Sequence, residues 1–194
     1  MGIGAVSGRR PRILKYFGCG GLWVFLLLAS GILSAQANEA DARSTAAMLA
    51  NIALFIDWPA QSFFTPGGPM LVCVLGERYL GDELRRNMAV KHIGARSIEI
   101  RHSESAASAR RCHIVFIDRT EEADLPGILA TLNGSAVLTV SDIADFARRG
   151  GMVGLVRQGE DLRFELNSTA AGKAGLAFDA GLKRVALTVL GEGE

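Results

Sequence analysis

The chain has 194 residues, of which 49% are hydrophobic and 21% are charged, and 21 basic residues against 20 acidic ones give a formal net charge of +1. This near balance, without a basic patch, argues against a protein that binds nucleic acid. Three cysteines and three scattered histidines provide no cluster with the spacing of a metal site.

The amino terminus has the three-part layout of a secretory signal peptide. Four basic residues precede the first acidic residue, an apolar run follows at Leu22–Leu33, and Ala35-Gln36-Ala37 forms a small-x-small cleavage site. An uncleaved membrane anchor is the alternative, but a membrane span needs about 20 apolar residues. We therefore expect a signal peptide over residues 1–37, cleaved after Ala37. The mature domain, residues 38–194, would have 17 basic and 20 acidic residues and a net charge of −3.

After this segment, short apolar strands alternate with stretches of helical periodicity. Met70–Gly76 and Ile114–Ile117 are nearly continuous apolar runs, which suit strands buried on both faces of a sheet. Helical spacing of apolar residues, ended by Trp58-Pro59, predicts a first helix. In chain order, the expected elements are a helix (39–58), a strand (70–76), a helix (79–88), a strand (97–102), a weak helix or turn (103–111), a strand (113–118), a helix (121–132), a strand (136–140), a helix (143–149), two strands (152–157 and 162–166) and two helices (170–174 and 179–190).

This order of elements predicts the fold class. Strands that alternate with helices at such spacing favour a parallel sheet covered by helices on both faces. The two strands on either side of Gln158-Gly159-Glu160-Asp161 have the pattern of a β-hairpin instead. We therefore expect a single three-layer α/β domain. Its sheet would be largely parallel and doubly wound (Rossmann-like), with an antiparallel hairpin near the C-terminal edge.

Motifs for catalysis or cofactor binding are missing. Gly76–Gly81 follows the first strand but lacks the spacing of a dinucleotide-binding fingerprint, and the sequence contains no phosphate-binding loop. A Gly-x-Ser-x-Gly nucleophile motif is also absent. His92, His102 and His113 are scattered, and we interpret them as partly exposed side chains. The sequence therefore predicts a protein that is not an enzyme and holds neither a cofactor nor a metal ion.

Two cysteines, Cys73 and Cys112, remain after cleavage, each in or next to a predicted buried strand. In an oxidising compartment, such a pair favours one structural disulfide over a metal site or a catalytic thiol. A bridge would form only if the two strands lie near one another. Two free buried thiols are the alternative.

Four aromatic residues gather at the end of the first helix and in the loop that follows it: Phe55, Trp58, Phe63 and Phe64. They could fill the core beneath the sheet. They could instead form an exposed aromatic patch that binds a partner, because such patches carry much of the energy of protein interfaces.

Several segments together resemble the YfiR-like family. Asn51–Pro59 resembles that family's first-helix signature, Leu71–Gly76 its first strand, and Arg111–Ile117 its cysteine-bearing third strand. Gly150–Leu155, Leu162–Asn167 and Ala174–Leu176 match its closing pattern. The agreement covers nearly the whole mature chain and keeps the family's order.

The resemblance implies a periplasmic repressor of an inner-membrane diguanylate cyclase. Members of the family engage the cyclase's periplasmic sensory domain, and release of this restraint raises cyclic di-GMP and favours biofilm formation. The resemblance also implies a structural disulfide between Cys73 and Cys112, a homodimer, and an outer-membrane lipoprotein that sequesters the repressor. For the cyclase interface we expect Phe55, Trp58, Phe63 and Phe64.

One departure from the family and one alternative function follow. The best-studied branch has a second cysteine pair around the segment that is Phe146–Leu155 here, and this chain has no cysteine there. We therefore do not expect redox control through such a pair. The alternative function is a periplasmic small-molecule-binding protein without a cyclase partner.

Overall fold

The structure is a computed structural model that describes residues 41–191 except 60, 61, 64, 66, 77 and 89–91. The predicted signal peptide, residues 1–37, lies outside the described residues, as does Phe64. The C-terminal residues 192–194 are likewise outside this range.

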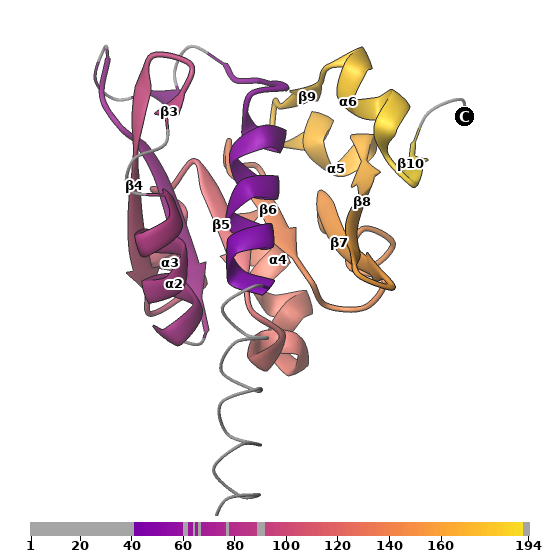
Figure 1. Cartoon of the computed structure of the whole chain (residues 1–194), viewed down its shortest axis with the longest axis horizontal. Coiled ribbons are helices and arrows are strands. Elements are labelled where there is room, and N and C mark those ends of the chain that lie inside the picture. The colour runs from indigo at the N-terminus through magenta and orange to yellow at the C-terminus, as the bar shows by residue number, and fades with distance from the viewer. Residues whose placement is uncertain are drawn as a thin grey trace, which may run out of the picture. The chain divides into compact units, whose positions relative to one another are not determined.

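An eight-stranded, mostly parallel sheet in the order β10-β8-β7-β6-β5-β2-β4-β3 forms the centre of the domain (Figure 1). Its strands are β2 (Met70–Leu75), β3 (His92–Ile93), β4 (Arg96–Ser103), β5 (Ile114–Ile117), β6 (Leu138–Ser141), β7 (Val153–Gln158), β8 (Asp161–Asn167) and β10 (Thr188–Leu190). A separate two-stranded antiparallel sheet joins β1 (Ile56–Asp57) to β9 (Ala177–Phe178).

The sheet is doubly wound, as the sequence predicts. From β2 the chain passes to β4 on one side, returns to β5 on the other side of β2, and continues to β6 and β7. These five strands pair in parallel. The chain then turns back at Gly159, where β7 and β8 form the predicted antiparallel hairpin. The short strand β10 pairs with β8 in parallel and lies at the edge beyond the hairpin.

Helices cover both faces and make the domain a three-layer α/β sandwich. The described helices are the first helix (residues 41–53), α2 (Arg78–Met88), α3 (Ala106–Ala109), the 3₁₀ helix η2 (Arg119–Asp124), α4 (Leu125–Leu132), α5 (Ser168–Lys173) and α6 (Ala180–Val185). Alternate residues of each strand face opposite helical layers. Val72 and Val74 pack in the cluster that contains Leu49 of the first helix, whereas Cys73 lies in the cluster that contains Leu125 of α4.

The predicted first helix is shorter than the sequence suggests. Helical structure ends at residue 53, and a turn leads into β1. Ile56 and Asp57 are extended because they pair with Phe178 and Ala177 of β9. Tertiary pairing with a distant segment has therefore overridden the local helical periodicity.

The predicted helix over 143–149 is absent, and the segment consists of turns. Asp145 has φ 56°, a left-handed conformation that interrupts helical hydrogen bonding. This turn places the Phe146 ring, which is 1% exposed, in the core beneath α4. Gly151 packs so closely on that ring that a methyl group at position 151 would overlap it. The requirement to bury Phe146 therefore explains the turn.

The predicted last helix, 179–190, is divided in two. Only Ala180–Val185 (α6) is helical, and the chain then extends as β10. The Leu187 amide donates a hydrogen bond of 2.9 Å to the Phe164 carbonyl, which starts the pairing with β8. Without this strand, the edge of β8 would have unpaired backbone groups.

Candidate partner-binding site at the amino-terminal edge of the sheet

The segment after the first helix presents apolar side chains to solvent. Leu54 and Phe55 are 51% and 45% exposed, and with Val185 they are the exposed large hydrophobic residues of the described chain. Their backbone is held by the β1–β9 pairing and by a hydrogen bond of 2.9 Å from the Asp179 amide to the Phe55 carbonyl. Phe55 is therefore exposed on a fixed backbone, which is a suitable arrangement for an interface anchor.

Trp58 and Phe63 behave differently from Phe55. Both are partly buried and pack against the hydrophobic core. Their rings lie 6.3 Å apart, edge to face, and both contact the ring of His113. We call these three residues the aromatic cluster. The four predicted interface residues thus divide between an exposed Phe55 and a partly buried pair, while Phe64 lies outside the described residues.

His113 is buried, contrary to the expectation of a partly exposed histidine. It is 4% exposed and directly precedes β5. Its Nδ1 accepts a hydrogen bond of 2.9 Å from the Leu71 amide, and its own amide donates one to the Leu71 carbonyl. The position between buried Cys112 and the all-apolar strand β5 is the sequence signal that indicates burial.

The surroundings of His113 favour the neutral imidazole. Burial lowers the pKa of His113 below its usual value of 6.5, and the positive charge of Arg96 acts in the same direction. The nearby Ser62 backbone acts in the opposite direction and raises the pKa of His113. Its contact with the ring does not meet hydrogen-bond geometry, so Nε2 has no hydrogen-bond partner among the described residues. Because Nδ1 is an acceptor, the neutral ring has its proton on Nε2.

Three buried polar atoms around this cluster have no hydrogen-bond partner among the described residues: Trp58 Nε1, His113 Nε2 and Ser62 Oγ. Two of them are N–H donors. Buried donors are usually satisfied by protein or by ordered water. These donors therefore need ordered water or an acceptor from outside the described residues.

Arg96 contacts the aromatic cluster, although the sequence did not predict it as a site residue. Its guanidinium carbon lies 3.7 Å from the centroid of the Phe63 ring, and Nη1 donates a hydrogen bond of 2.8 Å to the Gly68 carbonyl. The cation–π contact and the hydrogen bond both join the β3–β4 hairpin to the loop before β2. No local pattern in the sequence indicates this role, because the partners lie about thirty positions away.

An apolar groove of about 470 Å³ lies beside the aromatic cluster. Leu54, Trp58 and Phe63 contribute to its walls, and Arg96 is the one charged residue that lines it. A smaller pocket of about 150 Å³, lined in part by His113, lies beyond Phe63. The groove could receive an apolar side chain of a partner, and Arg96 could pair with a carboxylate beside it.

A disulfide between Cys73 and Cys112, with Cα atoms 6.0 Å apart, joins β2 to the start of β5. It lies on the α4 side of the sheet. Cys112 is adjacent to His113, so the bridge fixes the chain that supports the aromatic cluster. In the chain-entropy model, closing a loop of this length stabilises the fold by about 4 kcal/mol.

The described residues contain neither a candidate metal site nor a candidate membrane span. No group of three or more His, Cys, Asp or Glu side chains within residues 41–191, as far as they are described, is arranged to hold a metal ion. In the same part of the chain, no helix is long and apolar enough to cross a membrane.

Comparisons with known proteins identify relatives of the chain. The family model described as YfiR/HmsC-like matches residues 42–187. A conserved domain protein from Vibrio cholerae O1 biovar El Tor has a similar structure, with 11% identity, a TM-score of 0.50, and coverage of 62% of this chain and 54% of that chain. The ABC domain from Streptococcus pneumoniae, in complex with L-Trp, has 12% identity, a TM-score of 0.49, and coverage of 62% and 55%.

Of these two solved structures, only the Vibrio protein is similar enough to support the fold. This chain spans about half the length of both, and the Vibrio protein supports the α/β architecture without any inference about activity. The Streptococcus domain is too dissimilar to support an argument. No curated protein matches the chain in sequence.

Proposed function

Because the chain belongs to the YfiR/HmsC-like family, we propose that it is a periplasmic regulator of an inner-membrane diguanylate cyclase. It binds the cyclase's periplasmic sensory domain and restrains synthesis of cyclic di-GMP. The family match over residues 42–187 is the observation that carries this proposal. The role needs a binding surface and no catalytic group.

The restraint works by a shift of population. A cyclase that interconverts between inactive and active conformations is held inactive by any partner that binds the inactive conformation more tightly. Each tenfold preference for that conformation corresponds to about 1.4 kcal/mol. A soluble domain with a rigid anchor residue can supply such a preference without any chemistry.

The binding surface in this proposal is the Leu54–Phe55 turn together with the apolar groove. Phe55 is exposed on a fixed backbone, and Leu54 lies at the groove. Trp58 and Phe63 form groove walls and support the surface from beneath. Phe64 belongs to the same loop in the sequence and completes the proposed set.

The family resemblance supports three further parts of the proposal. The signal peptide, residues 1–37, directs the chain to the periplasm and is removed there. The mature protein acts as a homodimer. An outer-membrane lipoprotein competes with the cyclase for the repressor and so relieves the restraint.

The decisive experiment measures cellular cyclic di-GMP with and without this gene. We expect cyclic di-GMP to rise on deletion and to return to the wild-type level when the full chain, with its signal peptide, is restored on a plasmid. A version without residues 1–37 should remain in the cytoplasm and fail to restore it. Unchanged cyclic di-GMP in the deletion strain, across several growth conditions, would contradict the proposal and favour the small-molecule-binding alternative.

A further inference from the structure

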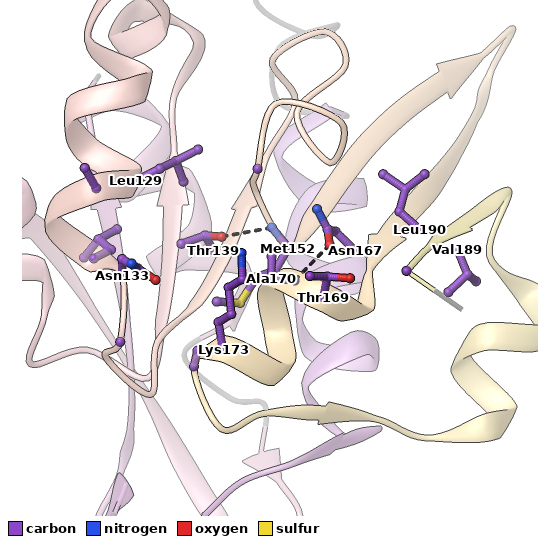
Figure 2. A pocket seen from close by; sticks show the side chains of 16 residues that line it. Leu129, Asn133, Thr139, Met152, Asn167, Thr169, Ala170, Lys173, Val189 and Leu190 are labelled. Atoms are coloured by element: carbon purple, nitrogen blue, oxygen red, sulfur yellow. Dashed lines mark hydrogen bonds between the residues drawn. The ribbon is translucent and has the colours of Figure 1, made fainter. Parts of the chain in front are cut away.

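A third cavity, of about 610 Å³, lies between the end of α4, helix α5 and the end of β10 (Figure 2). Its volume is within the range of pockets that bind small molecules. It shares no lining residue with the groove or with the pocket beside His113. We call it the α4–α5 pocket.

The walls of the α4–α5 pocket combine aliphatic and polar groups, the polar side chains being those of Asn133, Thr139, Asn167, Thr169 and Lys173. None of its lining residues is aromatic or acidic. Leucine, methionine and valine side chains supply most of the large apolar surface: Leu129, Leu132, Met152, Val189 and Leu190. Such walls offer no stacking partner for an aromatic ring, and their apolar side chains suit an aliphatic group.

Lys173 is the one charged residue that lines this pocket. Figure 2 shows its side chain extending from α5 into the pocket, with the amino group toward Thr139. No ion pair or hydrogen bond joins the Lys173 amino group to another described residue. The pocket therefore contains a single positive charge without a protein counter-ion among the described side chains.

Thr139 adds a hydrogen-bond donor at the floor of the pocket. It is 2% exposed, and its Oγ accepts a hydrogen bond of 3.1 Å from the Met152 amide. The hydroxyl proton has no acceptor within the described structure, so it remains for a ligand. The Asn167 side chain is held in place by two hydrogen bonds, because it accepts one from the Ala170 amide and donates one to the Ala147 carbonyl.

From this arrangement we propose that the α4–α5 pocket binds an aliphatic monocarboxylate. The carboxylate pairs with the Lys173 ammonium and accepts a hydrogen bond from the Thr139 hydroxyl, while the aliphatic chain lies against Leu129, Leu132 and Met152. One carboxylate balances the single positive charge. A phosphate monoester carries roughly two negative charges, so the single lysine would leave one of them unbalanced.

This site is independent of the proposed cyclase interface. The α4–α5 pocket contains neither Phe55 nor any residue of the groove, and its ligand can be tested without a partner protein. The probe is octanoate, and octanamide is its uncharged match of the same chain length. Both are titrated by calorimetry into protein purified from the periplasm of cells that express the full chain.

We expect octanoate to bind with a dissociation constant of about 1 mM or lower, and octanamide to bind about tenfold more weakly. Lys173→Met retains the aliphatic stem and removes the charge, so it should lose about tenfold in octanoate affinity and nothing in octanamide affinity. Arg184→Met, on exposed α6, is the matched control and should bind octanoate like the wild type. Equal binding of acid and amide, or unchanged octanoate binding by Lys173→Met, would overturn the proposal.

A second variant tests the location. Ala130 is an exposed residue of α4 that lines the pocket, and Ala130→Trp should fill it and abolish octanoate binding without loss of stability. Amide chemical-shift changes on octanoate addition should map to residues 129–134 and 167–174. Shifts that map instead to residues 54–63 would overturn the assignment. A dimer of the wild type that Ala130→Trp dissociates, together with no effect of octanoate on the wild type, would also overturn the assignment. The pocket would then be occupied by a second copy of the chain.

Discussion

The ring of Phe63 stacks on the imidazole of His113, with centroids 4.8 Å apart and 25° between the planes. This contact joins the loop before β2 to the start of β5 and places a buried histidine against an aromatic wall of the groove. The loop therefore depends on Phe63 for its attachment to the sheet.

Phe63→Ala should destabilise the domain by about 2 kcal/mol, because it removes the stacking on His113, the cation–π contact with Arg96 and part of the core packing. Urea unfolding followed by circular dichroism measures this change. Phe55→Ala is the control, and it should cost less than about 1 kcal/mol because its ring is 45% exposed. Equal losses in the two variants would show that Phe63 has no special role in attaching the loop.

Stability should fall as the pH is lowered through the His113 titration. The pKa of His113 is lower in the folded protein than the usual value of 6.5, mainly because the ring is buried. Below about pH 6.5 the unfolded state therefore binds more protons than the folded state. The neutral His113 ring makes its full contribution to the free energy of unfolding above that pH. This contribution is lost as the pH falls through the pKa of His113 in the folded protein.

The free energy of unfolding, measured between pH 7.5 and 5, should thus decrease more in the wild type than in His113→Gln. Glutamine can accept the Leu71 amide hydrogen bond without titrating. The exposed residue His92 gives the control variant His92→Gln, which should retain the wild-type profile. Identical pH profiles for the wild type and His113→Gln would show that His113 is not the cause of the loss of stability at low pH.

Loss of the disulfide should lower the free energy of unfolding by about 4 kcal/mol, on the loop-entropy argument for a separation of 39 residues. The double variant Cys73→Ala/Cys112→Ala avoids an unpaired thiol. Unfolding is compared for the wild type and the double variant, with and without dithiothreitol. The reductant should destabilise the wild type alone, and an effect on both proteins would mean that it acts elsewhere.

Phe55→Asp should weaken binding to the cyclase's periplasmic domain by more than about tenfold, because it puts a charge at the proposed anchor. Val185→Asp is the matched control, since Val185 is also exposed, at 57%, but lies on α6. Binding is measured by biolayer interferometry and stability by thermal unfolding. Wild-type binding by Phe55→Asp would remove this residue from the interface.

Gly151→Ala should destabilise the domain by about 1–3 kcal/mol, because its methyl group would overlap the buried Phe146 ring. Gly127→Ala is the opposite case. Position 127 lies in α4 with open space around it, so alanine there should stabilise by up to about 1 kcal/mol. Thermal unfolding of both variants checks the contrast, and a neutral Gly151→Ala would show that Phe146 can move.

Much of the central sheet is predictable from the sequence, because β2 and β5 are continuous apolar runs and apolar residues alternate with polar ones in β4 and β8. Predicted and observed limits of β2 differ by one residue, at Gly76, and the hairpin of β7 and β8 forms around the predicted turn at Gly159. A strand buried on both faces is usually apolar, although the buried strand β6 contains Thr139 and Ser141. The antiparallel hairpin beside a largely parallel sheet follows from these patterns, whereas β3 and the edge strand β10 do not.

The features that the sequence did not predict depend on contacts between distant segments. A left-handed Asp145 replaces the expected helix because Phe146 must reach the core, and β10 forms because β8 needs a neighbour. Neither requirement is visible in a local window. The α4–α5 pocket is a similar case, since Leu129, Thr139, Lys173 and Leu190 come from four separate elements.

The β1–β9 pairing has a consequence for the order in which the protein folds during synthesis. Ile56 is paired with Phe178, and the Phe55 carbonyl is held by the Asp179 amide. A ribosome makes Phe55 more than a hundred residues before either partner. The turn that presents Phe55 therefore cannot reach its final geometry on a growing chain. Incomplete chains that end before Phe178 would lack the formed surface around Phe55.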